Sequence, residues 1–238
     1  MEARPATPRQ PRDLRVDLLL DPFGARWSDL RDAAVAAVES GFGGIWTYDH
    51  VDGHVYDAPH VLECWTVLSA LAAVVPQVIL GPLVVNVANR HPGVLATMAA
   101  TLQEVSGGHL LLGLGAGAAR DTRYSREQEA IGLPVLGATE RRAQVTGCVA
   151  ELQRLWRTPG FLRPDPAPPV VIAAFGPKMA ELAGRLGDGI NTRATLPHMP
   201  ELLTIARAAH GDAGGDPDRF FVTLFSDFDE RWLPVESP

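Results

Sequence analysis

The residues whose types and spacing point most directly to chemistry lie between positions 170 and 178. Residues 170–174 are apolar and mostly β-branched, which predicts a buried strand. Gly176 and Pro177 follow, and proline at this place favours the first turn of a helix. Free backbone N–H groups and the positive end of the helix dipole converge at such a turn, which favours an anion. Turns of this kind also occur without a ligand, so the pattern alone leaves both interpretations open.

Lys178 strengthens the anion interpretation. It is the only lysine in the chain, and it falls in the first turn of the expected helix. A cation at that place opposes the helix dipole, and a bound phosphate would remove the conflict. The alternative is an ordinary turn that carries a solvated lysine.

Strand-like and helix-like segments alternate around this turn along the whole chain. The expected strands are 15–20, 44–48, 78–85, 109–114, 170–174, 190–193 and 220–225. The expected helices are 28–40, capped by Ser28, then 61–75, 93–105, 139–156, 177–186 and 197–210, with a partly helical loop at 118–137. Strands separated by helices predict parallel pairing, and this many units favour a (β/α)₈ barrel over a doubly wound sheet. The glycines within residues 113–117 lack the spacing of a dinucleotide fingerprint.

Composition narrows the class of protein. The net charge of −7 without a basic cluster argues against nucleic acid as a partner. Residues 65–88 carry no charge, but prolines divide them into a helix and a strand, which argues against a membrane span. Cys64 and Cys148 show no metal-ligand spacing, so no metal is expected and the thiols are read as buried and reduced. Residues 1–14 are expected to be a disordered lead-in without a signal peptide, 15–238 a single domain, and the protein cytoplasmic.

In a barrel, the chemistry lies where the strands end. These ends offer Asp49 and His50 after the second strand, Asn86 after the third, and small residues at 115–117 and 174–176. They contain one histidine and no carboxylate pair at a useful spacing. Such a set suits a bound cofactor that carries the chemistry itself.

Four segments together resemble the luciferase-like monooxygenase family of flavin- or deazaflavin-dependent oxidoreductases. They are GFGGIWTYDH at 41–50, VILGPLVVNVANRHPGVLATMAATLQEVSGGHLLLGLGAG at 78–117, EAIGLP at 129–134 and PPVVIAAFGPKMAELAGRLGDGIN at 168–191. The resemblance covers most of residues 15–230. It implies a (β/α)₈ barrel with FMN or coenzyme F-420, in reduced form, at the carboxyl ends of the strands.

The resemblance also implies roles for individual residues. Asp49 and His50 match the family's Asp-His pair beside the reactive ring, Leu83 and Val84 match its non-proline cis peptide, and Asn86 would lie alongside. Gly115, Ala116 and Gly117 match the turn that lines the ring, and Ala174, Phe175, Gly176 and Pro177 match the phosphate-binding turn next to Lys178. His50 is the candidate catalytic residue, since an imidazole can exchange a proton near neutral pH. The alternative is a histidine that only contacts the cofactor or stabilises the strand end.

The expected function is a monooxygenase that uses reduced FMN and dioxygen on a small organic substrate. The first alternative is hydride transfer with coenzyme F-420, and the second is a truncated flavin-binding protein without turnover. Ala118 stands where the deazaflavin sugar dehydrogenases of the family have an acidic residue, which favours the monooxygenase.

The last barrel unit is missing from the expected elements. After the seventh strand too few residues follow for an eighth strand and its helix. A barrel shortened in this way leaves strand edges unpaired, which favours association. We therefore expect a homodimer in which a partner, or the N-terminal tail, covers the open seam.

Overall fold

The computed structural model describes residues 15–226, so the expected lead-in at 1–14 and residues 227–238 lie outside the described part. Its strands are all parallel. One sheet has the order β1 (Leu18–Leu20), β2 (Gly44–Thr47) and β3 (Ile79–Pro82). The other has the order β4 (Val85–Asn86), β5 (Leu112–Gly115), β6 (Val170–Ala173), β7 (Gly189–Arg193) and β8 (Phe221–Phe225). A parallel bridge between Leu80 and Leu110 connects them.

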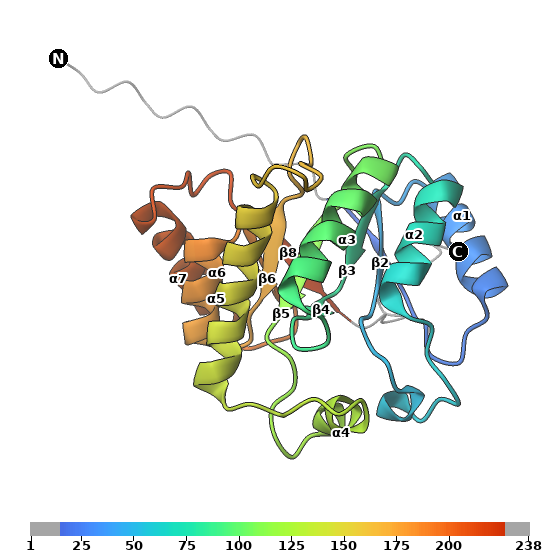
Figure 1. Cartoon of the computed structure of the whole chain (residues 1–238), viewed down its shortest axis with the longest axis horizontal. Coiled ribbons are helices and arrows are strands. Elements are labelled where there is room, and N and C mark those ends of the chain that lie inside the picture. Colours follow the sequence, from blue (N-terminus) through green and yellow to red (C-terminus); the bar gives the residue numbers. More distant parts are fainter. Residues whose placement is uncertain (1–14, 227–238) are drawn as a thin grey trace, which may run out of the picture.

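Helices cover the outer face of these strands (Figure 1). They are α1 (Trp27–Glu39), α2 (Cys64–Val74), α3 (Pro92–Val105), α5 (Ala138–Leu155), α6 (Pro177–Leu186) and α7 (Met199–Asp212). Two shorter helices, a 3₁₀ turn at Gly53–Tyr56 and α4 (Arg123–Ala130), contact each other at one end of the molecule. The alternation that the sequence predicts, and its α/β barrel class, are confirmed.

The period of two along each strand separates an inner from an outer core. Ile45, Leu112 and Ile172 point outward and are fully buried against the helices. Trp46 and Leu111 point inward and pack with a third strand residue, Val171. The barrel interior is therefore filled by side chains at the level of these residues.

The structure differs from two local expectations. Ser28 does not cap α1, because that helix begins at Trp27 and the N–H of Arg26 is satisfied by the Asp29 carboxylate at 3.2 Å. The expected third strand, 78–85, is split into β3 and β4. Pro82 lies at the break, because proline has no backbone N–H to donate to a neighbouring strand.

The barrel is not closed within residues 15–226. The last strand, β8, pairs with β7 on one side, and no described strand pairs with its other edge or with the outer edge of β1. Phe221 and Leu224 of β8 are 47% and 46% exposed. Because β3 and β4 are halves of one strand, β8 is the seventh strand of the predicted order. The open barrel of residues 15–226 is consistent with the shortened barrel that the sequence predicts.

No helix between residues 15 and 226 combines the length and the apolar character that crossing a membrane requires. The uncharged residues 65–88 form α2 and then β3, β4 and their connections, as the sequence indicates.

Candidate functional site

Most of the predicted site residues lie at one edge of the sheet, where the parallel strands end. Asp49 and His50 follow β2, and Asn86 ends β4. Asn86 is in register with Gly115 of β5, and its backbone N–H donates to the Asp49 carboxylate at 2.9 Å. Strand β6 pairs with β5 and leads into residues 174–178. The structure thus brings the segments that the sequence singled out to a common edge.

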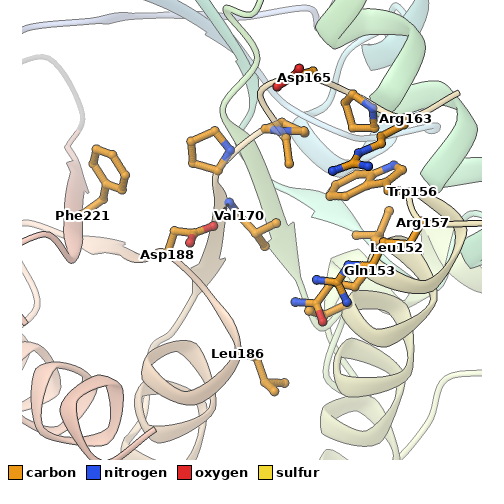
Figure 2. Close-up of a pocket in the computed structure, with 15 residues that line it drawn as sticks. Leu152, Gln153, Trp156, Arg157, Arg163, Asp165, Val170, Leu186, Asp188 and Phe221 are labelled. Carbon is orange, nitrogen blue, oxygen red and sulfur yellow. Dashed lines mark hydrogen bonds between the residues drawn. The ribbon is translucent and has the colours of Figure 1, made fainter. Parts of the chain in front are cut away.

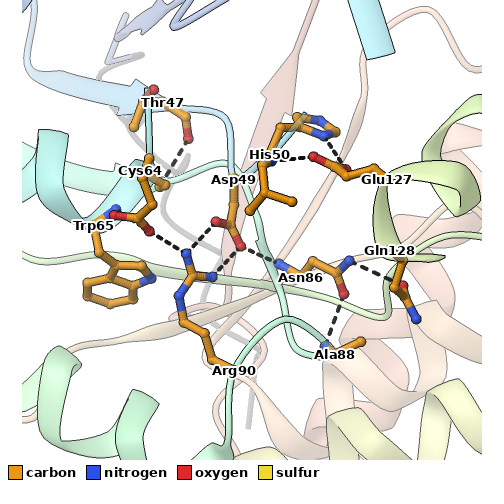
Figure 3. Close-up of polar contacts among 12 residues, drawn as sticks. Thr47, Asp49, His50, Cys64, Trp65, Asn86, Ala88, Arg90, Glu127 and Gln128 are labelled. Carbon is orange, nitrogen blue, oxygen red and sulfur yellow. Dashed lines mark hydrogen bonds and ion pairs between the residues drawn. The ribbon is translucent and has the colours of Figure 1, made fainter. Parts of the chain in front are cut away.

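The carboxylate of Asp49 is buried and held by hydrogen bonds (Figure 3). Arg90 donates to both of its oxygens, at 2.6 and 2.7 Å, and also to Glu63 at 2.5 Å. Burial alone would lower the pKa of Arg90, but the hydrogen bonds and charges of Asp49 and Glu63 raise it above its usual value. The group ties the end of β2 to the segment after β4, so this carboxylate positions strand ends. A direct cofactor contact by Asp49 stays a prediction.

Close packing accounts for the glycines at the end of β5. The Leu83–Val84 peptide is cis, at the position that the family resemblance implied. A Cβ added to Gly115 would lie 2.6 Å from Val84 Cγ2, and one added to Gly117, where φ is +73°, would lie 2.6 Å from Asn86 Oδ1. These glycines make room for neighbouring side chains. Their predicted role, with Ala116, in lining a ring is untested.

His50 forms a pair with Glu127 of α4 (Figure 3). Its Nδ1 lies 2.8 Å from Glu127 Oε2, and both side chains are largely buried. The other oxygen of Glu127 accepts from the backbone N–H groups of Val51 and Asp52. Since a carboxylate accepts at Nδ1, that nitrogen carries the proton and neutral His50 has an unprotonated Nε2. No hydrogen bond within residues 15–226 occupies Nε2, which is therefore available as a proton acceptor.

Four aromatic side chains surround the His50 ring. Ring centroids lie 5.3 Å away for Phe23, 5.8 Å for Tyr124, 6.0 Å for Tyr56 and 6.2 Å for Tyr48. Apolar ring faces keep bulk water away from a base, and phenol groups add hydrogen-bonding capacity. The surroundings of His50 thus suit proton exchange with a bound molecule more than a purely structural contact.

The turn before α6 has the geometry that the sequence predicts. Gly176 precedes the helix in an extended conformation, with φ −160°, and Pro177 is its first residue. No acceptor within residues 15–226 takes up the backbone N–H of Gly176 or Lys178. A Cβ added to Gly176 would meet no atom within 4 Å. Open space in front of free N–H groups and an exposed lysine fits an anionic group such as the phosphate of FMN or F-420.

Phe175, in the same turn, is 53% exposed and lies edge-on to Phe225 of β8, with ring centroids 6.2 Å apart. Ala174 is fully buried, so only its backbone can serve a ligand. Both residues lie at the expected edge, and their cofactor contacts stay predictions.

Sequence reasoning missed Arg90, Glu63 and Glu127. The signal for Arg90 was an isolated charge directly after the uncharged stretch 65–89. The signal for Glu127 was weaker. Helix α4 is polar throughout, and nothing in its sequence distinguishes buried Glu127 from exposed Glu129.

A pocket of about 490 Å³ lies elsewhere, near the amino-terminal ends of β6 and β7 (Figure 2). Its lining includes Trp156, Arg163, Val170, Asp188 and Phe221. None of its lining residues belongs to the site around His50, and barrel enzymes place their chemistry at the opposite strand ends.

Comparisons with known proteins agree with the fold. The luciferase-like monooxygenase family model matches residues 6–227. An F420-dependent glucose-6-phosphate dehydrogenase of Beutenbergia cavernae is 32% identical over 177 residues, which are 68% of this chain and 51% of that protein. The chain spans about half the length of such curated relatives.

Two solved structures show the shared fold. An F420-dependent secondary alcohol dehydrogenase, in complex with an F420-acetone adduct, has a TM-score of 0.76 and 21% identity over 88% of this chain and 68% of that one. The FMN complex of a type II Baeyer-Villiger monooxygenase from Pseudomonas putida has a TM-score of 0.70 and 19% identity over 88% and 67%. With a family model that matches nearly the whole described barrel, the chain belongs to the luciferase-like monooxygenase family.

Proposed function

We propose that this protein is an oxidoreductase that transfers hydride between coenzyme F-420 and a small organic substrate. The observation that carries the proposal is the His50–Glu127 pair at the carboxyl ends of the strands, with Nε2 free to exchange a proton. Hydride transfer to or from an oxygen-bearing carbon needs such a proton partner. The curated relative with 32% identity is named for its F420 dependence, whereas the flavin monooxygenase reaches 19% and shares the fold alone. The F-420 alternative therefore has more support than the monooxygenase expected first.

In this proposal, the strand ends hold the coenzyme. Leu83, Val84 and Asn86 would lie against its ring with the 115–117 turn, and the turn at 174–178 would hold its phosphate. Asp49 would act through the strand ends that its carboxylate ties together. The coenzyme supplies a ring carbon that gives or takes a hydride. The chain's own residues orient the substrate, exclude water and move the proton.

His50 would move that proton through Nε2. Glu127 keeps Nδ1 protonated and would stabilise the imidazolium that forms when Nε2 accepts the substrate's hydroxyl proton. In the reverse direction the imidazolium returns the proton to the product oxygen. Because Glu127 is also fixed by the N–H groups of Val51 and Asp52, the imidazole is held in one orientation.

The test is a titration of the purified protein with oxidised F-420 and with FMN, followed by fluorescence and absorbance. We expect F-420 to bind and a substrate alcohol to reduce it without dioxygen. Binding of FMN with dioxygen consumption would favour the monooxygenase instead. If neither coenzyme binds more tightly than about 1 mM, or about −4 kcal/mol, the proposal is wrong.

Replacing Gly176 tests the phosphate site. We expect Gly176→Asp to abolish coenzyme binding, because a carboxylate would occupy the place of the phosphate. The fold should persist, since φ of −160° suits any residue and the Cβ position is open. Gly176→Ala is the matched control and should bind normally. Unchanged coenzyme affinity in Gly176→Asp would move the phosphate away from this turn.

A non-catalytic flavin-binding protein is the second candidate, and the open edge of β8 is the observation that favours it. A barrel that is open along β8 can hold a ring without enclosing a substrate. Coenzyme binding by the full chain with no turnover of any alcohol or carbonyl compound would support this alternative.

We also propose that the protein forms a homodimer across the open edge of β8, near which Phe221 and Leu224 are exposed. Sedimentation velocity at micromolar concentration should show a dimer that dissociates when Phe221 and Leu224 are replaced by serine. Val94→Ser is the control, since Val94 is 55% exposed on α3, away from that strand. A wild-type monomer at these concentrations would contradict the proposal.

The two free, buried cysteines fit a reducing compartment such as the cytoplasm.

A further inference from the structure

Two tyrosines beside His50, together with an arginine that contacts both of them, form a polarised group that the proton exchange described above does not use. Tyr56 comes from the short 3₁₀ helix, and Arg123 and Tyr124 come from α4. The Tyr56 and Tyr124 rings both pack near the imidazole, with centroids 6.0 and 5.8 Å from it. The two phenols therefore border the same space as the base.

A chain of hydrogen bonds connects these side chains. Arg123 Nη2 donates to the Tyr124 hydroxyl at 3.2 Å, and the two phenol oxygens lie 3.3 Å apart. The Arg123 guanidinium also lies over both rings, 4.5 Å from the Tyr56 centroid and 5.1 Å from that of Tyr124. A phenol oxygen that accepts from a cation and from a second phenol has its own proton left for a third partner.

The two phenols differ in acidity. Burial raises the pKa of Tyr124, but hydrogen bonds from Tyr56 and Arg123 outweigh it, so the net pKa is lowered. Burial and the hydrogen bond to Tyr124 raise the pKa of Tyr56. Tyr124 is thus the more acidic phenol and the better hydrogen-bond donor, and Tyr56 is the less acidic one. The other charged or titratable groups that face the pair are His50, Tyr48 and Arg193.

We propose that Tyr124, polarised by Arg123 and Tyr56, donates a hydrogen bond to the substrate oxygen whose proton His50 exchanges. The inference rests on the proposed hydride transfer and names its substrate class as an alcohol and the corresponding carbonyl compound. A hydroxyl group satisfies both sides of the space, since it donates to His50 Nε2 and accepts from Tyr124.

The step balances without a further reactant. During oxidation the C–H bond breaks and its electron pair leaves as hydride to oxidised F-420, the O–H proton passes to His50 Nε2, and the C=O bond forms. Tyr124 keeps its proton throughout and holds the oxygen while negative charge develops there. Its contribution is therefore greatest in the transition state.

The first measurement needs no coenzyme. The chain has three tyrosines, so their ionisation can be resolved by absorbance near 295 nm. We expect one tyrosine to ionise below the ordinary value of about 10 and Tyr124→Phe to remove that transition. Arg123→Gln should shift it upward, and Arg126→Gln, an exposed arginine on the same helix, should leave it in place. A transition that persists in Tyr124→Phe would overturn the proposal.

The second measurement is F-420 reduction by 2-propanol, cyclohexanol and glucose 6-phosphate. Loss of a hydrogen bond to a developing charge should lower kcat of Tyr124→Phe by about 10- to 100-fold, with the dissociation constant of F-420 unchanged. Turnover within twofold of wild type would overturn the role of Tyr124 alone. A wild-type protein that reduces F-420 with none of these alcohols would contradict the proposed function, and with it the role assigned to Tyr124.

Discussion

Arg90→Met is expected to destabilise the protein by about 3–5 kcal/mol at neutral pH, the usual effect of removing one partner from a buried ion pair. Methionine fills much of the space but leaves the Asp49 carboxylate, which is fully buried, without its two strongest donors. Urea denaturation followed by circular dichroism measures the loss. Arg154→Met is the control. Arg154 makes a similar pair with Glu151 on the surface of α5, and its replacement should cost at most about 0.5 kcal/mol.

The pH dependence of this loss provides a second check. Burial raises the pKa of Glu63, but hydrogen bonds from Thr66, Arg90 and Trp65 lower it by more than burial raises it. The net pKa of Glu63 therefore lies below the usual value. A carboxyl group with a depressed folded-state pKa stabilises the fold above its unfolded-state pKa, and this stabilisation is lost as pH falls through the folded-state pKa. The wild type should therefore lose stability on acidification below pH 4 more steeply than Arg90→Met does. Equal stability of both proteins at neutral pH would show that the ion pairs of Arg90 with Asp49 and Glu63 contribute nothing.

The elements of the fold could be predicted because their signals are local. The apolar run 170–174 and the Gly-Pro turn are enough to indicate β6 and α6, and Gly187 marks the end of that helix as expected. The prediction that Ser28 caps α1 was wrong, because Ser28 is followed directly by Asp29, a second residue that can cap a helix. The Asp29 carboxylate accepts from the N–H of Arg26. Pro82, which interrupts the expected strand 78–85, accounts for its split into β3 and β4.

The site could be predicted only in part, because its contacts connect distant positions. Asp49 and Arg90 are 41 residues apart in the sequence, and His50 and Glu127 are 77 apart. No period or spacing signals such a pair. Helix α4 resembles a solvated helix in sequence, since its buried residues, Ser125, Glu127 and Gln128, are as polar as its exposed ones. Ser125 is buried in the cap of its own helix, beside Thr122, whereas Glu127 and Gln128 find partners near the strand ends, and only the folded chain shows that.

Removal of the His50 side chain shows whether it acts as a base, which lowers kcat, or only as a structural or binding residue, which changes the F-420 dissociation constant. We expect His50→Ala to lower kcat by roughly 10²- to 10⁴-fold, the usual contribution of general acid-base catalysis, and to change the F-420 dissociation constant little. Added imidazole should restore part of the activity, because the deleted ring leaves room between Phe23 and Tyr124. His54→Ala is the matched control. That side chain is 87% exposed four positions away and should leave both constants unchanged.

Glu127→Gln separates the proton-transfer role of His50 from its orientation. An amide at this position still accepts from the N–H groups of Val51 and Asp52 through one oxygen, but it presents its NH₂ group to Nδ1. Nδ1 then accepts, the proton moves to Nε2, and the base loses its free lone pair. We therefore expect kcat to fall nearly as far as in His50→Ala while the fold and F-420 affinity persist. A His50→Ala protein that binds F-420 poorly but turns over at the wild-type rate when saturated would show that His50 only binds the coenzyme, and Glu127→Gln would then reduce affinity instead of rate.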